Sequence, residues 1–406
     1  MVSKKVQLKE VAQYHTDKVL TKNLTLYNYI ATTNMLPNKA GITSAESLPK
    51  NEKVNEFTTQ DILISNIRPY FKKIWFSNLS GGCDADILNI RADKMKILPE
   101  YLFNLLSKDD FFDYVMVGAK GVKMPRGDKN FILEYEFQLP NLSDQKQIVD
   151  KLMPLWNKIK SNCEIINLLE EYSQLQFQKW FIDFNFPDNN GNPYKKSGGE
   201  LVKVDGTLIP KQWAYIQLND AINCIIDHRG KTPTKLKSMW SNEGIVALSA
   251  LNVKNGHLVN LSKSNKVNDE LYAKWMKDEL TEGDILMTSE APLGEFYLIL
   301  NNEKYCLSQR LFAIRANDKI VNFSYLFQEL SGSRGLKKII NKKSGSTVFG
   351  IRQEELRKVI ILLPNKVIQD KYDEMIMPIF RKIRALETEN LLLEETRDLL
   401  IKKLIK

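Results

Sequence analysis

The chain has 406 residues, of which 43% are hydrophobic and 10% aromatic, so it is no disordered tail and is long enough for two or three domains. No apolar run approaches the roughly 20 residues that span a bilayer, and the first residues lack the apolar core of a signal peptide. We therefore expect a cytoplasmic protein without membrane contact. The formal net charge of +9 favours nucleic acid or another polyanion as a partner.

The cysteines and histidines give no support for a disulfide framework or a zinc site. The four cysteines lie far apart without a Cys-x-x-Cys pair, and the chain has three histidines. Spacings typical of metal or disulfide motifs are missing, so we expect no metal ion on this chain.

The first globular segment, residues 1–140, is predicted to mix strands and helices, an α/β (α+β) pattern. Short apolar runs predict strands at 61–65 and 134–139, and a helix is predicted at 101–106. The glycine-rich loop Gly118–Gly127 lies between that helix and the last strand.

Two long amphipathic helices are predicted, in residues 141–184 and 365–406, each directly after a Leu-Pro pair. Apolar residues in both alternate steps of four and three, which is coiled-coil spacing. Ordinary core packing explains most such stripes, but two equal helices would bury their seams best against each other, antiparallel. Pro154 and Pro378 should kink or restart each helix. The seam is predicted at Ile148, Leu152, Leu155, Ile159, Ile166 and Leu169, and at Ile376, Ile379, Ile383, Leu386, Leu393 and Leu400.

The second globular segment, residues 210–364, repeats the first after a connector at 185–209 that is rich in Pro, Gly and Asn. Leu139-Pro140 returns as Leu363-Pro364, an offset of 363 − 139 = 224 residues that holds without a gap through the long helices. The repeated residues are of core and turn type, whereas the loops between them differ. We interpret the chain as a tandem duplication whose two copies present different chemistry.

Catalytic motifs are not found in the sequence. Gly230-Lys231-Thr232 resembles the end of a phosphate-binding loop, but the position of its first glycine is occupied by Ile225. The three histidines lie in no nucleophile-elbow or cysteine-protease context. We expect no catalytic residues in this chain.

Basic residues among glycines, serines and threonines stand before each long helix, at the same place in both halves. Glycine lets the backbone approach a phosphate, hydroxyls donate to phosphate oxygens, and Lys or Arg neutralise charge or read guanine edges. A solvated basic loop is the simpler explanation, which the recurrence weakens. The DNA-binding candidates are Lys120, Lys123, Arg126 and Lys129 in the first half, and Arg229, Lys231, Thr232, Lys342, Lys343, Ser344, Ser346, Thr347 and Arg352 in the second.

These features together resemble the specificity subunit of type I restriction-modification systems. The resemblance rests on Leu139–Gln145 and Leu363–Gln369, on the helix end Gln178–Phe184, on Ile209–Trp213 and on Arg229–Pro233, and it covers the whole chain. It implies two α/β target-recognition domains, 1–140 and 210–364, separated by two long antiparallel helices, each domain reading one half of a bipartite site in double-stranded DNA.

The resemblance also implies partners and cofactors. Two modification (methyltransferase) subunits would dock on the helices and restriction subunits would join them, so that S-adenosylmethionine, ATP and Mg are expected on those partners and no cofactor on this chain. Two alternatives remain open. One is a basic coiled-coil scaffold that binds only proteins, and salt-dependent binding to duplex DNA would exclude it. The other is an enzyme whose site is not recognised, which S-adenosylmethionine binding by the chain alone would support.

Overall fold

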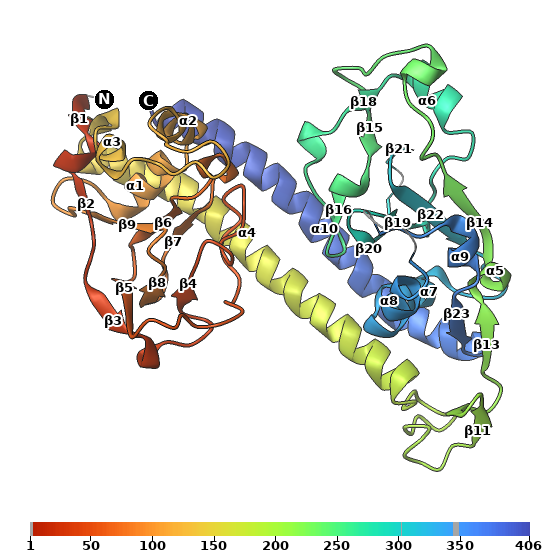
Figure 1. The fold of residues 1–406 in the computed structure, drawn as a ribbon. Coiled ribbons are helices and arrows are strands. Elements are labelled where there is room, and N and C mark those ends of the chain that lie inside the picture. The colour runs from red at the N-terminus through yellow and green to blue at the C-terminus, as the bar shows by residue number, and fades with distance from the viewer. Residues whose placement is uncertain (1–2, 302, 344–348) are drawn as a thin grey trace. The chain divides into compact units, whose positions relative to one another are not determined.

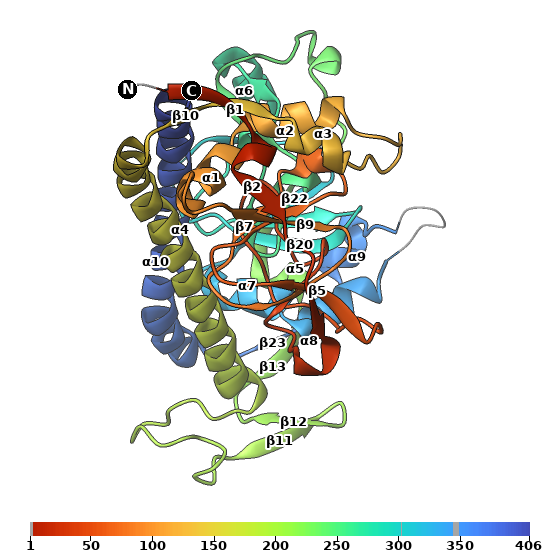
Figure 2. The same cartoon turned by 90° about the vertical axis from the view of Figure 1, so that its left-hand side faces the viewer.

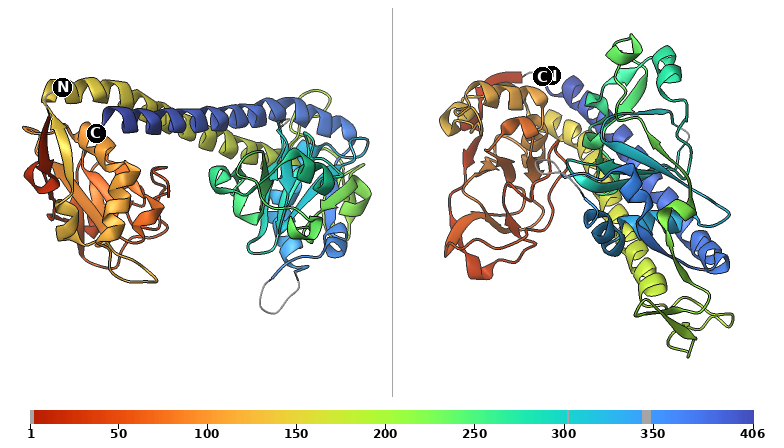
Figure 3. Two further views of the ribbon diagram at one scale, coloured as in Figure 1. Left: turned by 90° about the horizontal axis from the view of Figure 1, so that it is seen from above. Right: turned by 45° about the vertical axis from the view of Figure 1, so that its right-hand side comes forward.

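The computed structural model describes residues 3–301, 303–343 and 349–406. It contains two compact units, residues 1–165 with 386–406 and residues 166–385. Each unit therefore holds one globular part together with a portion of both long helices, and both chain termini belong to the first unit (Figures 1 and 3). No helix in the described part of the chain is long and apolar enough to cross a membrane.

The globular part of the first unit is built on two sheets of four strands. The antiparallel sheet has the order β2-β9-β6-β7, the mixed sheet has the order β3-β5-β8-β4, and β1 pairs with β10. The strands are β1 (Ser3–Gln7), β2 (Ala12–Tyr14), β3 (Lys18–Leu20), β4 (Tyr29–Ile30), β5 (Lys53–Phe57), β6 (Ile62–Ser65), β7 (Ile74–Phe76), β8 (Gly81–Cys83), β9 (Ile87–Ala92) and β10 (Glu136–Pro140). The helices are α1 (Pro99–Leu106), α2 (Asp109–Val117) and α3 (Lys129–Leu133), so the predicted strands and helix are confirmed.

The globular part of the second unit repeats this plan. Its antiparallel sheet β14-β22-β19-β20 and its pair β13-β23 have the topology of β2-β9-β6-β7 and β1-β10. The strands are β13 (Ala214–Gln217), β14 (Ile222–Asp227), β15 (Ile245–Leu248), β16 (Val253–Lys254), β17 (His257–Leu258), β18 (Lys266–Val267), β19 (Ile285–Ser289), β20 (Leu293–Leu298), β21 (Tyr305–Leu307), β22 (Leu311–Ala316) and β23 (Ile360–Leu363). The helices are α5 (Leu218–Ala221), α6 (Asp269–Trp275), α7 (Phe323–Ser331), α8 (Ser333–Ile340) and α9 (Gln353–Arg357). A three-stranded sheet, β18-β15-β21, differs from β3-β5-β8-β4 in strand number and order, and β16 pairs with β17 in a separate two-stranded sheet.

The long helices are α4 (Leu142–Phe177) and α10 (Lys366–Leu404). Asn141 and Asn365 begin them in the same way, each accepting a hydrogen bond at Oδ1 from the main chain three residues later, at 2.9 and 3.0 Å. Both helices continue through their prolines, so the predicted restart is wrong. Pro154 and Pro378 lie on the exposed side of their helices, so the carbonyl that loses its hydrogen bond faces solvent, while buried neighbours such as Leu152 and Ile376 pack the helix in place.

Within each unit the two long helices run antiparallel. In the first unit, Trp156 packs against Arg397 and Asn162 hydrogen-bonds Asn390. Residues further along α4 thus contact residues closer to the start of α10. In the second unit, Trp180 packs on Tyr372 near the start of α10. The structure buries the seam residues Ile148, Leu152, Ile159, Ile166, Ile376, Ile383 and Leu386, and half-buries Leu155, Leu169, Ile379, Leu393 and Leu400.

The ends of the helices also belong to the core of the globular part. In the first unit, Ile148 and Leu152 of α4 and Ile401 of α10 share one apolar cluster with the antiparallel sheet and α1. The seam is therefore wider than a two-helix coiled coil, because it covers a sheet domain as well as the partner helix.

The same buried glutamine joins helix and domain in each half. The Gln145 amide accepts from Leu98 N at 2.8 Å and donates to Lys96 O at 3.2 Å and Pro140 O at 2.9 Å. The Gln369 amide accepts from Asn322 N at 2.8 Å and donates to Ile320 O at 3.2 Å and Pro364 O at 2.8 Å. All six partners are related by the 224-residue offset, which explains why the Leu-Pro-x-x-x-x-Gln pattern occurs twice.

After α4 the chain makes one turn of π-helix, Gln178–Ile182, and enters the connector. The strands β11 (Leu201–Val204) and β12 (Thr207–Pro210) form a hairpin beyond the end of α4 (Figure 2). Phe186 stacks on both Tyr194 and Trp213, at 4.6 and 5.1 Å between ring centroids, so the connector has a small aromatic core of its own.

Candidate nucleic-acid interface

Two loops meet at the surface of the first unit, the Gly118–Gly127 loop and the loop that follows β6. Arg126 exchanges both backbone hydrogen bonds with Lys120 at 2.9 Å, and Arg68 N donates to Pro125 O at 2.8 Å. Arg126 also forms an isolated bridge with Ile67. The main chain thus fixes the position from which the Arg126 side chain projects.

The candidate side chains on this loop are exposed. The Arg126 guanidinium lies 3.1 Å from Asp86 and stays 55% exposed. A surface ion pair of this kind contributes little to stability, so a phosphate or base edge can replace Asp86 at small cost. Lys120 contacts Asp128 at 2.8 Å, and that hydrogen bond raises the pKa of Lys120 and lowers the pKa of Asp128. Lys123 and Lys129 are also exposed.

The second unit brings the equivalent two loops together with different residues. Gly350 forms the isolated bridge there with Glu290, and Ile351 N donates to Ser289 O at 3.0 Å. A Cβ on Gly350 would lie 3.0 Å from Ser289 O and from the Glu290 Cβ, so the close approach of the two loops favours glycine. We call this meeting of the two loops the joint. Its backbone contacts recur in both units, whereas its side chains differ.

Near this joint the predicted residues are partly described. Lys342 lies 3.8 Å from Glu355, and the Lys343 ammonium lies 4.4 Å from the centre of the Phe349 ring. Arg352 is exposed at the start of α9. Ser344, Ser346 and Thr347 lie outside the described residues.

The Arg229–Pro233 segment forms a turn whose charged side chains bind other groups of the same chain. Arg229 binds the Asp227 carboxylate with two nitrogens at 2.9 and 2.8 Å and lies 4.3 Å above the Phe312 ring. The Lys231 ammonium donates to the Trp275 carbonyl, and burial lowers its pKa. Thr232 Oγ1 accepts from Lys235 N at 3.3 Å. These residues are distant in sequence from the joint of the two loops. Arg229, Lys231 and Thr232 each form a hydrogen bond within the chain.

Residues that the sequence did not single out also contribute to the joints. Arg68 has a left-handed backbone (φ 50°) and opens a turn that exposes Tyr70 and Phe71, whose ring centroids are 4.7 Å apart. In the second unit Arg310 is half exposed, 3.2 Å from Glu290. Pro69 and Pro292 are equivalent in the two repeats, so the sequence marks the position of the loop after β6 and of its counterpart after β19. No pattern in the sequence indicates which side chains these loops expose.

Both long helices expose leucines at equivalent positions. Leu168 is 65% exposed and its counterpart Leu392 is 60% exposed; Leu175 is 58% exposed and its counterpart Leu399 is 69% exposed. A seven-residue spacing places each pair on one face of its helix. Isolated exposed leucines are common, but here the same pair is exposed in both repeats.

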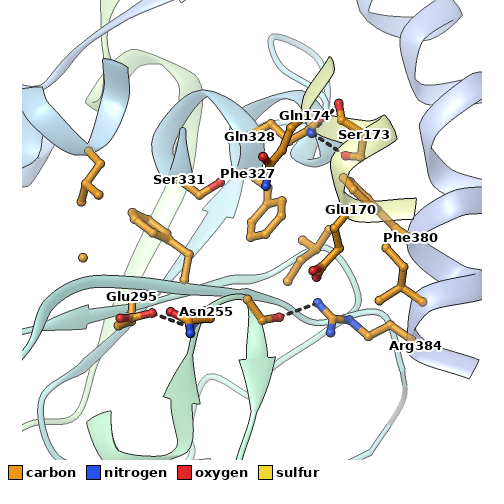
Figure 4. Close-up of a pocket in the computed structure, with 16 residues that line it drawn as sticks. Glu170, Ser173, Gln174, Asn255, Glu295, Phe327, Gln328, Ser331, Phe380 and Arg384 are labelled. Atoms are coloured by element: carbon orange, nitrogen blue, oxygen red, sulfur yellow. Dashed lines mark hydrogen bonds between the residues drawn. The ribbon is translucent and has the colours of Figure 1, made fainter. Parts of the chain in front are cut away.

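A cavity of about 500 Å³ lies in the second unit between its helices and its sheet domain. Figure 4 shows Glu170, Phe327 and Phe380 around it, and Glu295 accepts a hydrogen bond from the Asn255 main chain at 2.6 Å at its edge. The first unit has larger side chains at two equivalent positions: Trp156 corresponds to Phe380, and Arg397 corresponds to Ser173. The Arg397 guanidinium lies 4.0 Å from the centre of the Trp156 ring. Side-chain size therefore differs at these two positions, and the turn between β16 and β17 adds Asn255 and Gly256 to the lining of the cavity.

Comparison with known proteins agrees with this architecture. Residues 3–171 and 210–395 each match the model of the type I restriction modification DNA specificity domain. The HindI specificity subunit of Haemophilus influenzae is 22% identical over 438 residues, covering 93% of each chain. The MjaIX specificity subunit of Methanocaldococcus jannaschii is 24% identical over 313 residues, covering 76% of this chain and 68% of that subunit.

A solved structure shows the same fold. The S subunit of a type I restriction-modification system from M. genitalium has a TM-score of 0.59 and 13% sequence identity, covering 100% of this chain and 96% of that one. With two matching domains in tandem, each including most of a long helix, the chain belongs to the family of type I restriction-modification DNA specificity subunits.

Proposed function

We propose that this chain reads a bipartite target in double-stranded DNA, with one recognition domain for each half-site. One observation carries the proposal: the same two loops join in both units, through Ile67 and Arg126 in one and through Glu290 and Gly350 in the other. A repeated scaffold with unlike side chains is the arrangement expected of two readers of different sequences.

The charges near the joints support a DNA ligand. Lys120, Lys123 and Arg126 surround the first joint, and Lys342, Lys343 and Arg352 stand near the second. Lysines neutralise phosphates without reading sequence, whereas arginine forms paired hydrogen bonds with the guanine edge. Binding to duplex DNA should therefore weaken steeply as salt rises, which a scaffold that binds only proteins would not show.

We expect Arg126→Ala to relax one half of the methylated target and Arg352→Ala to relax the other. Loss of a paired contact to a base costs about 1–3 kcal/mol of discrimination at that base, while the other half-site keeps its contacts. The measurement is sequencing of methylated positions after modification by the complex assembled with each variant.

Lys151→Ala is the matched control, because Lys151 is exposed on α4. It should leave both half-sites unchanged. A uniform fall in methylation with an unaltered target would show that Arg126 contacts phosphate and would contradict its assignment to a base. Relaxation of both half-sites by one substitution would contradict the assignment of one half-site to each domain.

The exposed leucines support the docking of two modification subunits, one on each helix. Equivalent surfaces, Leu168 with Leu175 and Leu392 with Leu399, suit two copies of one partner. In this proposal the chain holds no catalytic group or cofactor; the modification subunits bind S-adenosylmethionine, and the restriction subunits supply ATP- and Mg-dependent cleavage.

Leu168→Asp should remove one modification subunit from the assembly, and Leu392→Asp the other. Burying a leucine contributes roughly 1.5–3 kcal/mol, so replacing it by a charge weakens docking at least about tenfold. Native mass spectrometry of the reconstituted complex would count the copies. Leu208→Asp, in the connector hairpin, is the control because Leu208 is 53% exposed. Retention of two copies by both variants would refute the docking surfaces.

A further inference from the structure

Three side chains capable of binding a metal converge in the first unit. His15 follows β2, Asp17 precedes β3, and Glu56 lies in β5, which pairs with β3. His15 Nε2 is 3.6 Å from Asp17 and 4.0 Å from Glu56, and one ligand atom of each residue lies within 4.8 Å of the other two. Nothing in the sequence marked this group, because Glu56 is 56 − 17 = 39 residues from Asp17.

The imidazole of His15 is buried without a hydrogen-bond partner. Its side chain is 10% exposed, and its Nε2 makes no hydrogen bond in the structure. A buried polar nitrogen without a partner is costly, so such groups usually meet water or an ion. The Asp17 side chain is 75% exposed, so the group of three side chains borders solvent.

Among the described residues, no lysine or arginine lies within ion-pair distance of the two carboxylates, although the charge of Arg91 acts on both. Arg91 gives its guanidinium to Asp61, with two bonds of 2.7 Å, and Lys18 donates to Asn55 Oδ1 at 2.6 Å. In the part of the chain that the structure describes, His15 is the sole ion-pair partner of Asp17 and of Glu56. Two carboxylates and one imidazole therefore face one another with their ligand atoms within 4.8 Å.

We propose that His15 Nε2, Asp17 and Glu56 bind one divalent transition-metal ion, with Zn²⁺ the best match and solvent completing the coordination. Imidazole together with carboxylates selects such ions over Mg²⁺ and Ca²⁺, which take oxygen ligands. Zinc bonds of about 2.0–2.2 Å in a tetrahedral site place ligand atoms about 3.3–3.6 Å apart, so rotation of the exposed carboxylates is needed to close the site.

The ion would fasten the turn between β2 and β3 to β5. His15 and Asp17 flank that turn, and Glu56 N already donates to Asp17 O at 2.7 Å. The site would thus brace the edge of the mixed sheet of the first recognition domain, and it does not depend on the proposed DNA function.

The test uses the full, tag-free chain stripped with a chelator and titrated with Zn²⁺ by calorimetry and with Co²⁺ by visible absorption. We expect one ion per chain, a visible band from Co²⁺ with nitrogen and oxygen ligands, and slower amide exchange in residues 15–20 and 53–57 when Zn²⁺ is added. His15→Gln should abolish all three signals, and Asp17→Asn should weaken binding.

His257→Gln is the matched control, since His257 also lies near a carboxylate, 3.4 Å from Glu170. It should bind the ion as the unaltered chain does. The proposal is overturned if the unaltered chain takes up no ion, or if His15→Gln binds with the same stoichiometry and spectrum. A stripped His15→Gln chain that retains its circular dichroism and melting temperature shows that lost binding is not lost folding.

Discussion

Replacing Gln145 by leucine is expected to loosen the attachment of α4 to the first recognition domain. Gln369→Leu is expected to loosen the attachment of α10 to the second. Each glutamine is fully buried and satisfies one main-chain N–H and two main-chain carbonyls. Leaving a buried group unsatisfied costs about 1–3 kcal/mol, so three groups amount to at least about 3 kcal/mol for each substitution.

Amide exchange followed by mass spectrometry locates the effect. Gln145→Leu should accelerate exchange in residues 96–106 while leaving 320–331 unchanged, and Gln369→Leu should do the converse. Gln147→Leu serves as the control, because Gln147 is exposed two residues further along the same helix. If neither substitution changed the exchange of its own domain, the repeated glutamine would not be the link between helix and domain.

The repeated sequence positions predicted the architecture well, because they are the positions that build it. The Leu-Pro-x-x-x-x-Gln pattern corresponds to a capped helix start and a buried amide that binds three main-chain groups. The seam residues follow heptad spacing and are buried or half-buried. The restart predicted at the prolines was wrong, because sequence spacing alone does not show that Pro154 and Pro378 face solvent.

The candidate interface was less predictable, because it depends on contacts between distant segments. Arg126 and Arg229 look alike in sequence, yet Arg126 is 55% exposed whereas Arg229 is held by Asp227 and the Phe312 ring. Arg68, Tyr70 and Phe71 acquire significance only where their loop meets the Gly118–Gly127 loop. No pattern in one segment encodes such a meeting.

The difference between the two helix-domain junctions is also a matter of single side chains. Arg397 packs on Trp156 in the first unit, whereas their counterparts Ser173 and Phe380 line a cavity in the second. The offset of 224 residues identifies these pairs in the sequence, but only the structure shows how each pair packs.

Exchange of residues 1–138 for the corresponding segment of another family member should replace one half of the DNA target. The segment carries the first joint with Arg126, and the second domain is left intact. Because Gln145 binds main-chain groups of Lys96, Leu98 and Pro140, the exchanged segment can keep the same link to α4 despite different side chains.

Sequencing of methylated positions in DNA modified by the assembled chimaera tests the central claim most directly. We predict that one half-site becomes that of the donor of the segment while the other half-site stays that of this protein. A target changed in both halves, or in neither, would contradict the assignment of one recognition domain to each half-site.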